Sequence, residues 1–291
     1  MNRNKQALGP DFLVVGAPRA GTSWLYAVLR QHPSLWLAPV KELHYFDKPV
    51  RTRTWFDPYE RRRVRPIKLD SWYLSYLLGK RSDEWYAKLF AKAKLRGLLA
   101  GEATPDYAVL ATDVFKRIEL MNPNVRLILV MRDPIDRSWS ALNNAAKKGR
   151  ANLSDINTAI QWARLEGPKA RSTYIHSIER LERVFPNDQI HYCFFDDLAT
   201  RPAPFVDGVL SFLGVDSIDA QLLSSAPINA VAKGRPVPFE FAREMAKDFL
   251  PSVCDLCKRF DGAPHTWRAR YEELLKTDLQ EFVVPSLPSD R

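Results

Sequence analysis

The chain has 291 residues, is 46% hydrophobic and 26% charged, and carries a formal net charge of +9 at pH 7. This length suffices for one large α/β domain or two small ones, and the ordinary globular composition argues against wholesale disorder. The positive charge favours an anionic ligand, an acidic polymer or nucleic acid as the partner.

The charge is uneven along the chain. Residues 51–68 hold seven Arg/Lys and two Asp/Glu, so five of the nine net charges lie in this stretch. The pattern fits either a docking surface for an anionic acceptor or partner, or a solvated basic loop. The stretch lies within a polar, basic segment with interleaved Trp and Tyr, about residues 48–82, which we interpret as an insertion.

Cysteine content and apolar runs indicate the class of protein. Three cysteines, Cys193, Cys254 and Cys257, are too few for a disulfide-stapled secreted domain. Cys254 and Cys257 have the C-x-x-C spacing, but no second pair completes a zinc site, so two helical thiols or one local disulfide fits better. No segment offers about 18 uninterrupted apolar residues, and the N-terminus lacks a signal-peptide core, so we expect a soluble intracellular protein.

Predicted strands and helices alternate along the chain. Apolar runs and helical spacing predict strands at 12–15, within 97–107, at 125–132 and at 189–198, and helices at 22–31, 83–94, 135–148, 174–185 and 205–215. This alternation indicates a parallel sheet with right-handed crossovers. The predicted fold class is α/β, with a central parallel β-sheet flanked by helices, in a single domain over residues 1–291.

The loop at residues 16–23, "GAPRAGTS", joins the first strand to the first helix and has the form of a phosphate-binding loop without its lysine. In P-loop nucleotide triphosphatases a lysine follows the second glycine. Here Gly21 is followed by Thr22 and Ser23, and the cation, Arg19, comes two residues earlier. A tight turn with a Thr/Ser cap explains the glycines and hydroxyls but not the arginine. Anion binding at the helix N-terminus is therefore favoured.

Two further motifs carry cations suited to phosphate. In "VMRDPIDRSWSAL" (130–142), Arg132 leaves the end of a strand and Ser140 lies in the next helix, which suits a second phosphate. A structural Arg132–Asp133 pair explains the same residues equally well. In "AKGRPVP" (232–238), a glycine between two cations is flexible enough to fold over a phosphate.

The segment "PVKELHYFD" (39–47) brings Lys41, Glu42 and His44 together just after the first helix. A carboxylate beside a lysine and a histidine suits general-base chemistry on a hydroxyl or amine. Each of the three residues, taken singly, is more often a surface charge.

Together these motifs resemble the sulfotransferases that use 3′-phosphoadenosine 5′-phosphosulfate (PAPS) as donor, over about residues 11–240. The resemblance is closest to the branch that includes the heparan sulfate N- and 3-O-sulfotransferases and related bacterial enzymes. "KELHYFD", "GEATPDY", "YIHSIERL" and the "FPNDQI…FDDL" strand also fall in family order. The resemblance implies a P-loop NTPase-like three-layer architecture, PAPS as co-substrate with adenosine 3′,5′-bisphosphate as product, and no metal.

Carried over to this sequence, the resemblance implies a donor site. Arg19 neutralises charge on the leaving 5′-phosphate, and Arg132 with Ser140 grips the 3′-phosphate. The implied phosphosulfate cradle and the segment that closes over the nucleotide comprise Ala20, Gly21, Thr22, Ser23, Trp24, Lys233, Gly234 and Arg235. Arginine at 19 and alanine at 20 replace the commoner lysine and Ser/Thr, so the charge is kept but not the side-chain shape.

The resemblance also implies a catalytic and acceptor site. Glu42 matches the general base, Lys41 a donor-side cation and His44 a neighbouring active-site histidine; Glu42 and His44 also face the acceptor. A segment that lines the acceptor cleft comprises Thr104, Pro105, Asp106 and Tyr107. The implied reaction is an in-line sulfuryl transfer, in which positioning and charge stabilisation supply most of the rate.

The acceptor and the cellular setting follow less directly. A glycan or a small-molecule natural product fits the basic, aromatic-containing segment, and we expect a cytoplasmic bacterial enzyme that binds neither nucleic acid nor membrane. Two alternatives stay open. A P-loop nucleotide kinase or triphosphatase would depend on magnesium, and a non-catalytic polyanion binder would show salt-dependent oligonucleotide affinity. The oligomeric state is left open.

Overall fold

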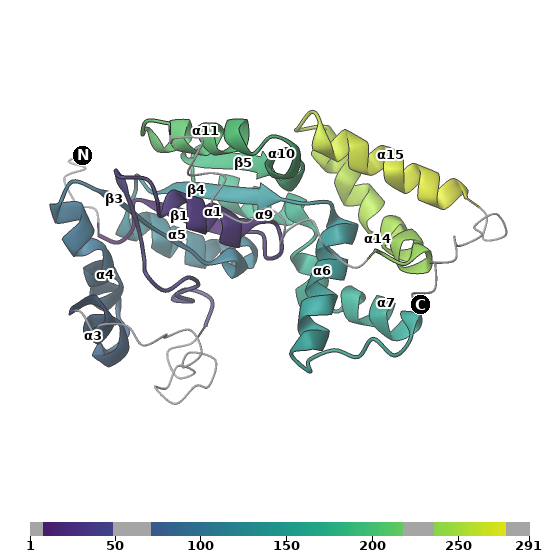
Figure 1. Ribbon diagram of the computed structural model, residues 1–291, viewed down its shortest axis with the longest axis horizontal. Coiled ribbons are helices and arrows are strands. Elements are labelled where there is room, and N and C mark those ends of the chain that lie inside the picture. Colours follow the sequence, from purple (N-terminus) through teal and green to yellow (C-terminus); the bar gives the residue numbers. More distant parts are fainter. Residues whose placement is uncertain (1–7, 49–70, 218–235, 278–291) are drawn as a thin grey trace, which may run out of the picture. The chain divides into compact units, whose positions relative to one another are not determined.

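The computed structural model describes residues 8–48, 71–217 and 236–277 (Figure 1). The chain forms two compact units, Met1–Arg132 with His176–Gly234, and Asp133–Ile175 with Arg235–Arg291. The single domain expected from the sequence stays a prediction. Within the described ranges, no helix combines the length and the apolarity needed to cross a membrane.

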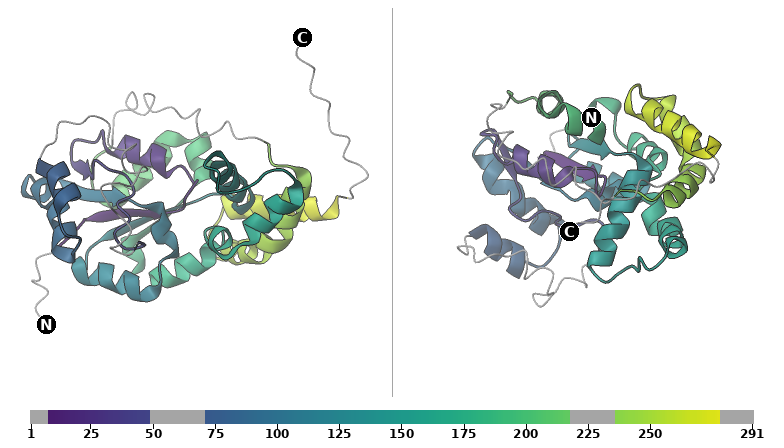
Figure 2. Two further views of the ribbon diagram at one scale, coloured as in Figure 1. Left: turned by 90° about the horizontal axis from the view of Figure 1, so that it is seen from below. Right: turned by 45° about the vertical axis from the view of Figure 1, so that its right-hand side comes forward.

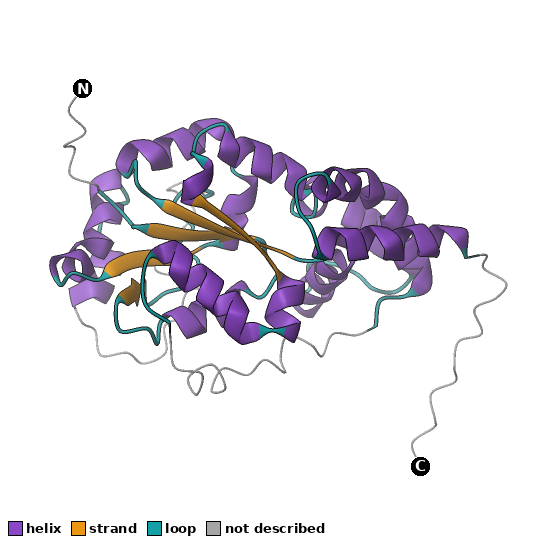
Figure 3. Cartoon of the chain, turned by 90° about the horizontal axis from the view of Figure 1, so that it is seen from above, coloured by secondary structure: helices purple, strands orange, loops and turns teal. Residues whose placement is uncertain are grey.

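The first unit is built on a five-stranded parallel sheet in the order β2-β3-β1-β4-β5. Its strands are β1 (Phe12–Gly16), β2 (Leu35–Leu37), β3 (Leu99–Ala103), β4 (Arg126–Met131) and β5 (Ile190–Phe194). Every residue of the central β1 is buried, because helices cover both faces of the sheet (Figure 3). A strand buried on both faces is a continuous apolar run, which is the pattern seen in the sequence. The predicted α/β class with a central parallel sheet is confirmed.

Helices of the first unit connect these strands or follow the last of them. They are α1 (Thr22–Leu29), α3 (Ser71–Leu78), α4 (Asp83–Leu95), α5 (Thr112–Met121), α10 (Phe195–Thr200) and α11 (Pro202–Leu213), with 3₁₀ turns η2 (Pro105–Val109) and η3 (Asn187–Gln189). Helix α9 (Tyr174–Glu182) begins in the second unit and continues into the first. The strand predicted at 189–198 was too long. Asp196 and Asp197 stand in the first turn of α10, where carboxylates favour a helix.

The described end of the predicted insertion belongs to the core. Tyr73 and Tyr76 of α3 are buried with Tyr86 of α4 in one aromatic cluster. Trp72 stacks on Tyr76 with ring centroids 5.3 Å apart, and its indole N–H donates to the carbonyl of Leu89 at 2.8 Å. Residues 71–82 are therefore a packing element rather than a polar loop. The basic stretch 51–68 lies outside the described residues.

The second unit is helical and comprises α6 (Pro134–Lys147), α7 (Ile156–Arg164), α8 (Glu166–Ala170), α14 (Phe239–Cys257) and α15 (Ala263–Lys276). Helices α14 and α15 pack against each other (Figure 2). Asp133 caps α6, and its carboxylate accepts from Tyr271 at 2.8 Å and pairs with Arg270 at 2.8 Å. Cys254 and Cys257 are free thiols in α14, as one of the two expected arrangements predicts.

Candidate functional site

The loop between β1 and α1 ends in an uncapped helix N-terminus. Gly21 is the N-cap residue in the left-handed region (φ 84°), and as a glycine it has no side chain with which to cap α1. A Cβ on Gly21 would stand 2.4 Å from Leu198 Cδ2, so glycine suits this close approach. Thr22 is buried and Ser23 is exposed. A helix N-terminus whose N-cap residue supplies no side-chain acceptor is suited to binding an anion.

Two arginines lie at this loop, Arg19 within it and Arg132 directly after β4. Arg19 adopts φ 73° and is exposed, and its carbonyl oxygen accepts from Arg132 Nη1 at 3.2 Å. The Arg132 guanidinium lies over the Phe195 ring, 4.6 Å from its centroid. Although Arg19 is exposed as a whole residue, the protein around its guanidinium group partly desolvates it. This desolvation, and after it the charge of Arg132, lower the pKa of Arg19, while the charge of Glu42 opposes that shift. Two guanidinium groups held within electrostatic range of each other are stabilised when an anion binds between them.

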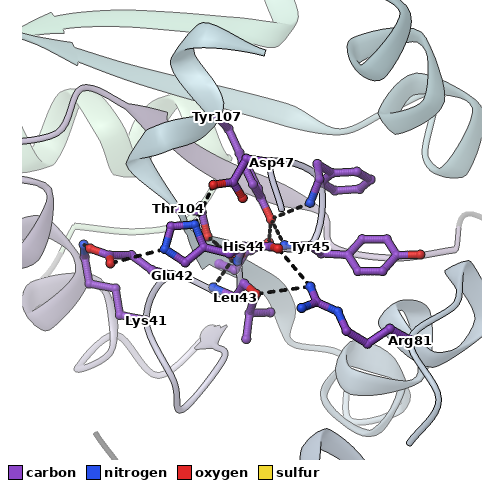
Figure 4. Close-up of polar contacts among 11 residues, drawn as sticks. Lys41, Glu42, Leu43, His44, Tyr45, Asp47, Arg81, Thr104 and Tyr107 are labelled. Atoms are coloured by element: carbon purple, nitrogen blue, oxygen red, sulfur yellow. Dashed lines mark hydrogen bonds and ion pairs between the residues drawn. The ribbon is translucent and has the colours of Figure 1, made fainter. Parts of the chain in front are cut away.

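The segment after β2 brings the three predicted catalytic residues together with a fourth (Figure 4). Lys41 Nζ lies 2.9 Å from Glu42 Oε1, and His44 Nε2 lies 3.7 Å from Glu42 Oε2. On its other side, His44 Nδ1 lies 2.7 Å from Asp47 Oδ2. The Glu42 side chain is 24% exposed and the His44 side chain only 4%. The Asp47 side chain is 13% exposed, so Glu42 is the more exposed carboxylate of this group.

The carboxylates set the protonation of the histidine. Burial lowers the pKa of His44, but hydrogen bonds to Asp47 and Glu42 outweigh it and raise the pKa above its ordinary value. Asp47 was not identified from the sequence. The His44-x-x-Asp47 spacing in "HYFD" was the available signal, yet only the folded loop shows that the two side chains meet.

The segment expected to line an acceptor cleft contacts the loop that carries Glu42. Thr104 and Tyr107 are 0% exposed, Pro105 is buried and Asp106 is half-buried. The Thr104 hydroxyl accepts from the His44 N–H at 3.4 Å, and the Tyr107 hydroxyl accepts from the Tyr45 N–H at 2.8 Å. That this segment contacts an acceptor stays a prediction.

The remaining residues of the predicted donor site come from several parts of the chain. Ala20 and Trp24 are buried beside the loop, and Ser140 lies in α6 of the second unit, in the helix expected after β4. Its grip on a 3′-phosphate with Arg132 stays a prediction. Lys233, Gly234 and Arg235 lie outside the described residues.

One group of side chains has the composition of a cation site. Ligand atoms of His44, Asp47 and Asp106 all lie within 4.8 Å of one another. The hydrogen bond between His44 and Asp47 accounts for the closest of these approaches without an ion. The expectation that the reaction needs no metal stays a prediction.

Proteins of known name are similar to this chain in sequence. Human heparan sulfate glucosamine 3-O-sulfotransferase 6 is 26% identical over 220 residues, 72% of this chain and 53% of that protein. The membrane-associated sulfotransferase kil1 of Dictyostelium discoideum is 28% identical over 172 residues, 58% of this chain and 27% of that protein. The chain thus spans about half, or less, of the length of these relatives.

Solved structures share the fold. The sulfotransferase from Alicyclobacillus acidocaldarius superposes with a TM-score of 0.63 at 24% identity, covering 89% of this chain and 98% of that one. The sulfotransferase domain of the Synechococcus PCC 7002 olefin synthase gives 0.50 at 17% identity, covering 96% and 98%. The model of the "Sulfotransferase family" matches residues 10–219, from the start of β1 through α11. The parallel sheet, the uncapped loop and the charged segment beside it all fall within that match, and the chain belongs to the sulfotransferase family.

Proposed function

We propose that the protein transfers a sulfuryl group from PAPS to a hydroxyl, or an amine, of a glycan or small-molecule acceptor. The observation that supports the proposal is the geometry of two neighbouring groups. Arg132 Nη1 donates to the carbonyl of Arg19 in the loop before α1 at 3.2 Å. Lys41 Nζ lies 2.9 Å from the partly exposed carboxylate of Glu42 in the segment after β2. The charge of Glu42 also acts on the pKa of Arg19, which supports the proximity of the two groups. A donor anion and a base for the acceptor need that proximity.

The donor is proposed from the chemistry of the loop. An uncapped N-terminus and two guanidinium groups suit a phosphosulfate, whose charge is neutralised by hydrogen bonds and arginine forks. The sequence has Thr22 after Gly21, not the lysine of a magnesium-nucleotide loop. Adenosine 3′,5′-bisphosphate is the product, and Arg132 and Ser140 are proposed to hold its 3′-phosphate.

The proposed step is an in-line displacement at sulfur. The acceptor oxygen forms a bond to sulfur, the bond between sulfur and the 5′-phosphate oxygen breaks, and the acceptor proton passes to Glu42. Lys41 and Arg19 offset the charge that grows on the departing phosphate oxygen. His44, held by Asp47, stands against Glu42 Oε2 and orients that carboxylate.

The acceptor class is proposed from the relatives. The human relative is named for a heparan sulfate glucosamine, so a glycan hydroxyl is the first class to test. A cytoplasmic location, a bacterial source and the absence of nucleic-acid or membrane partners are proposed from the sequence alone.

The test is a Glu42→Gln variant assayed for transfer of radiolabelled sulfate from PAPS to a panel of glycan and phenolic acceptors. Removing a general base lowers kcat by about 100- to 10,000-fold. Affinity for adenosine 3′,5′-bisphosphate is expected to change less than twofold. Lys247→Gln, which neutralises an exposed lysine in α14, serves as the matched surface control. Normal turnover by the Glu42→Gln variant would remove Glu42 from the base role and make His44 the leading candidate.

A further inference from the structure

The loop that carries the catalytic candidates has an unusual backbone. Glu42 adopts φ 63° and His44 adopts φ 51°, both in the left-handed region that residues other than glycine seldom occupy. Two such residues separated only by Leu43 persist when surrounding contacts determine the conformation. Contacts that hold this backbone therefore decide where the Glu42 carboxylate and the His44 ring point.

Successive N–H groups of the loop are held by β3 and the turn that follows it. The Glu42 N–H donates to the carbonyl of Ala103 at 2.9 Å, and the Leu43 N–H donates to Glu102 Oε2 at 3.3 Å. The next three N–H groups donate to side-chain hydroxyls, His44 to Thr104 at 3.4 Å, and Tyr45 and Phe46 to Tyr107 at 2.8 and 3.4 Å.

The carbonyl side of the loop has its own support. Arg81 Nη2 donates to the carbonyl of His44 at 2.8 Å and reaches that of Leu43 at 3.5 Å (Figure 4). The loop is thus held by hydrogen bonds on both sides. Acceptors face its N–H groups, and a guanidinium group faces its carbonyls.

The N–H contacts converge on one buried carboxylate. Glu102 is 0% exposed. Its Oε2 accepts from the Leu43 N–H and, at 2.7 Å, from the Thr104 hydroxyl; its Oε1 accepts from the Tyr107 hydroxyl at 3.1 Å and from the Tyr86 hydroxyl. The Thr104 and Tyr107 hydroxyls, which give their protons to Glu102, keep their lone pairs for the loop N–H groups.

We propose that Glu102 is a positioning residue that fixes loop 42–46 in the geometry that aims Glu42 and His44. A carboxylate only accepts hydrogen bonds, so it orients the protons of Thr104 and Tyr107 toward itself and their lone pairs toward the loop. A glutamine amide at this position would turn its own N–H groups toward some of the N–H and O–H groups that now donate to Glu102. Those hydrogen bonds would be lost. The inference rests on the proposed function only for its effect on turnover, not for the geometry of the loop.

The test compares Glu102→Gln with Tyr86→Phe. Both variants alter hydrogen bonding at the same carboxylate, but the Tyr86 hydroxyl makes none of the loop N–H contacts described above, so Tyr86→Phe is the matched control. Glu102→Gln is expected to lower kcat at least tenfold while affinity for adenosine 3′,5′-bisphosphate changes less than twofold. Tyr86→Phe is expected to keep kcat within about threefold.

A second readout does not need turnover. The charged groups that face the His44 ring include Glu42, Asp47, Lys48 and Asp106. If loop 42–46 shifts in the Glu102→Gln variant, His44 moves relative to these charged groups. The NMR titration midpoint of His44 then moves toward the ordinary histidine value of about 6.5. A purely structural role for Glu102 would lower stability and leave that midpoint in place.

The outcomes separate the two proposals. A shifted His44 midpoint in Glu102→Gln supports the positioning role even where no acceptor is turned over, in which case the proposed function alone fails. An unshifted midpoint together with wild-type kcat would overturn the positioning role while leaving the proposed function intact. Should Glu102→Gln not fold, Tyr107→Phe removes the acceptor of the Tyr45 and Phe46 N–H groups and is read by the same midpoint.

Discussion

The imidazole of His44 stands between two carboxylates, with Asp47 on Nδ1 and Glu42 on Nε2. Glu42 in turn contacts Lys41 through its other oxygen. A chain of alternating charge in a largely buried site is strengthened by the low local dielectric. These four side chains therefore behave as one unit, and a change at any of them is felt by Glu42.

The raised pKa of His44 has a consequence for stability. Because the folded state binds this proton more tightly than the unfolded state, protonation stabilises the fold below about pH 6.5, and the contribution is lost as pH rises through the folded pKa. Urea unfolding across this range should show a free energy of unfolding that falls with pH by up to about 1.4 kcal/mol per unit from this group. His44→Gln should flatten the slope. Equal slopes in both proteins would contradict the assignment.

At the scale of elements, the strand β1, its loop and helix α1 form the proposed phosphate-binding site, whose geometry depends on Gly21. The residue combines a left-handed backbone with a close approach to Leu198 of α10. Gly97 has a similar φ of 73° but no atom within 4 Å of its missing Cβ. Because the two glycines share a left-handed backbone but differ in the space around a Cβ, comparing them separates backbone strain from steric conflict.

Alanine substitutions at Gly21 and Gly97, made singly, test whether the loop before α1 binds the donor. Gly97→Ala should cost only the left-handed penalty of about 1–2 kcal/mol. Gly21→Ala should cost roughly 1–3 kcal/mol more, because the Leu198 and Phe195 side chains of α10 must shift, and should also weaken binding of adenosine 3′,5′-bisphosphate at least tenfold. Thermal unfolding and calorimetry measure the two effects. Equal losses of stability with unchanged nucleotide affinity would show that the loop does not bind the donor.

Sequence periodicity predicts the longer strands and helices. It misses elements that are very short or that become recognisable only through their packing against other elements. Strands β1 and β4 were predicted because their apolar runs are uninterrupted. The edge strand β2 has three residues, too few for any period to register. Helix α3 was read as part of a polar insertion, because its Trp and Tyr residues reveal an aromatic core only when α4 packs against them.

At the scale of the whole molecule, the α/β class and the donor-side motifs follow from the order of strands and loops along the chain. The positions of Lys41, Glu42 and His44 were predicted on chemistry and spacing. Asp47 and Glu102 were not, because a buried carboxylate in a sequence carries no sign of which donors will surround it. Glu102 meets residues up to 59 positions away, so only the fold brings the network together.

The proposed reaction requires that the chain bind a 3′-phosphorylated adenine nucleotide without magnesium. Isothermal titration calorimetry with adenosine 3′,5′-bisphosphate, in magnesium-free buffer and with ATP as control, measures this binding. We predict binding of the bisphosphate at least 100-fold tighter than that of ATP, since charge-assisted hydrogen bonds to a phosphate contribute about 1.5–3 kcal/mol each. Tighter binding of ATP that appears only when magnesium is added would contradict the account.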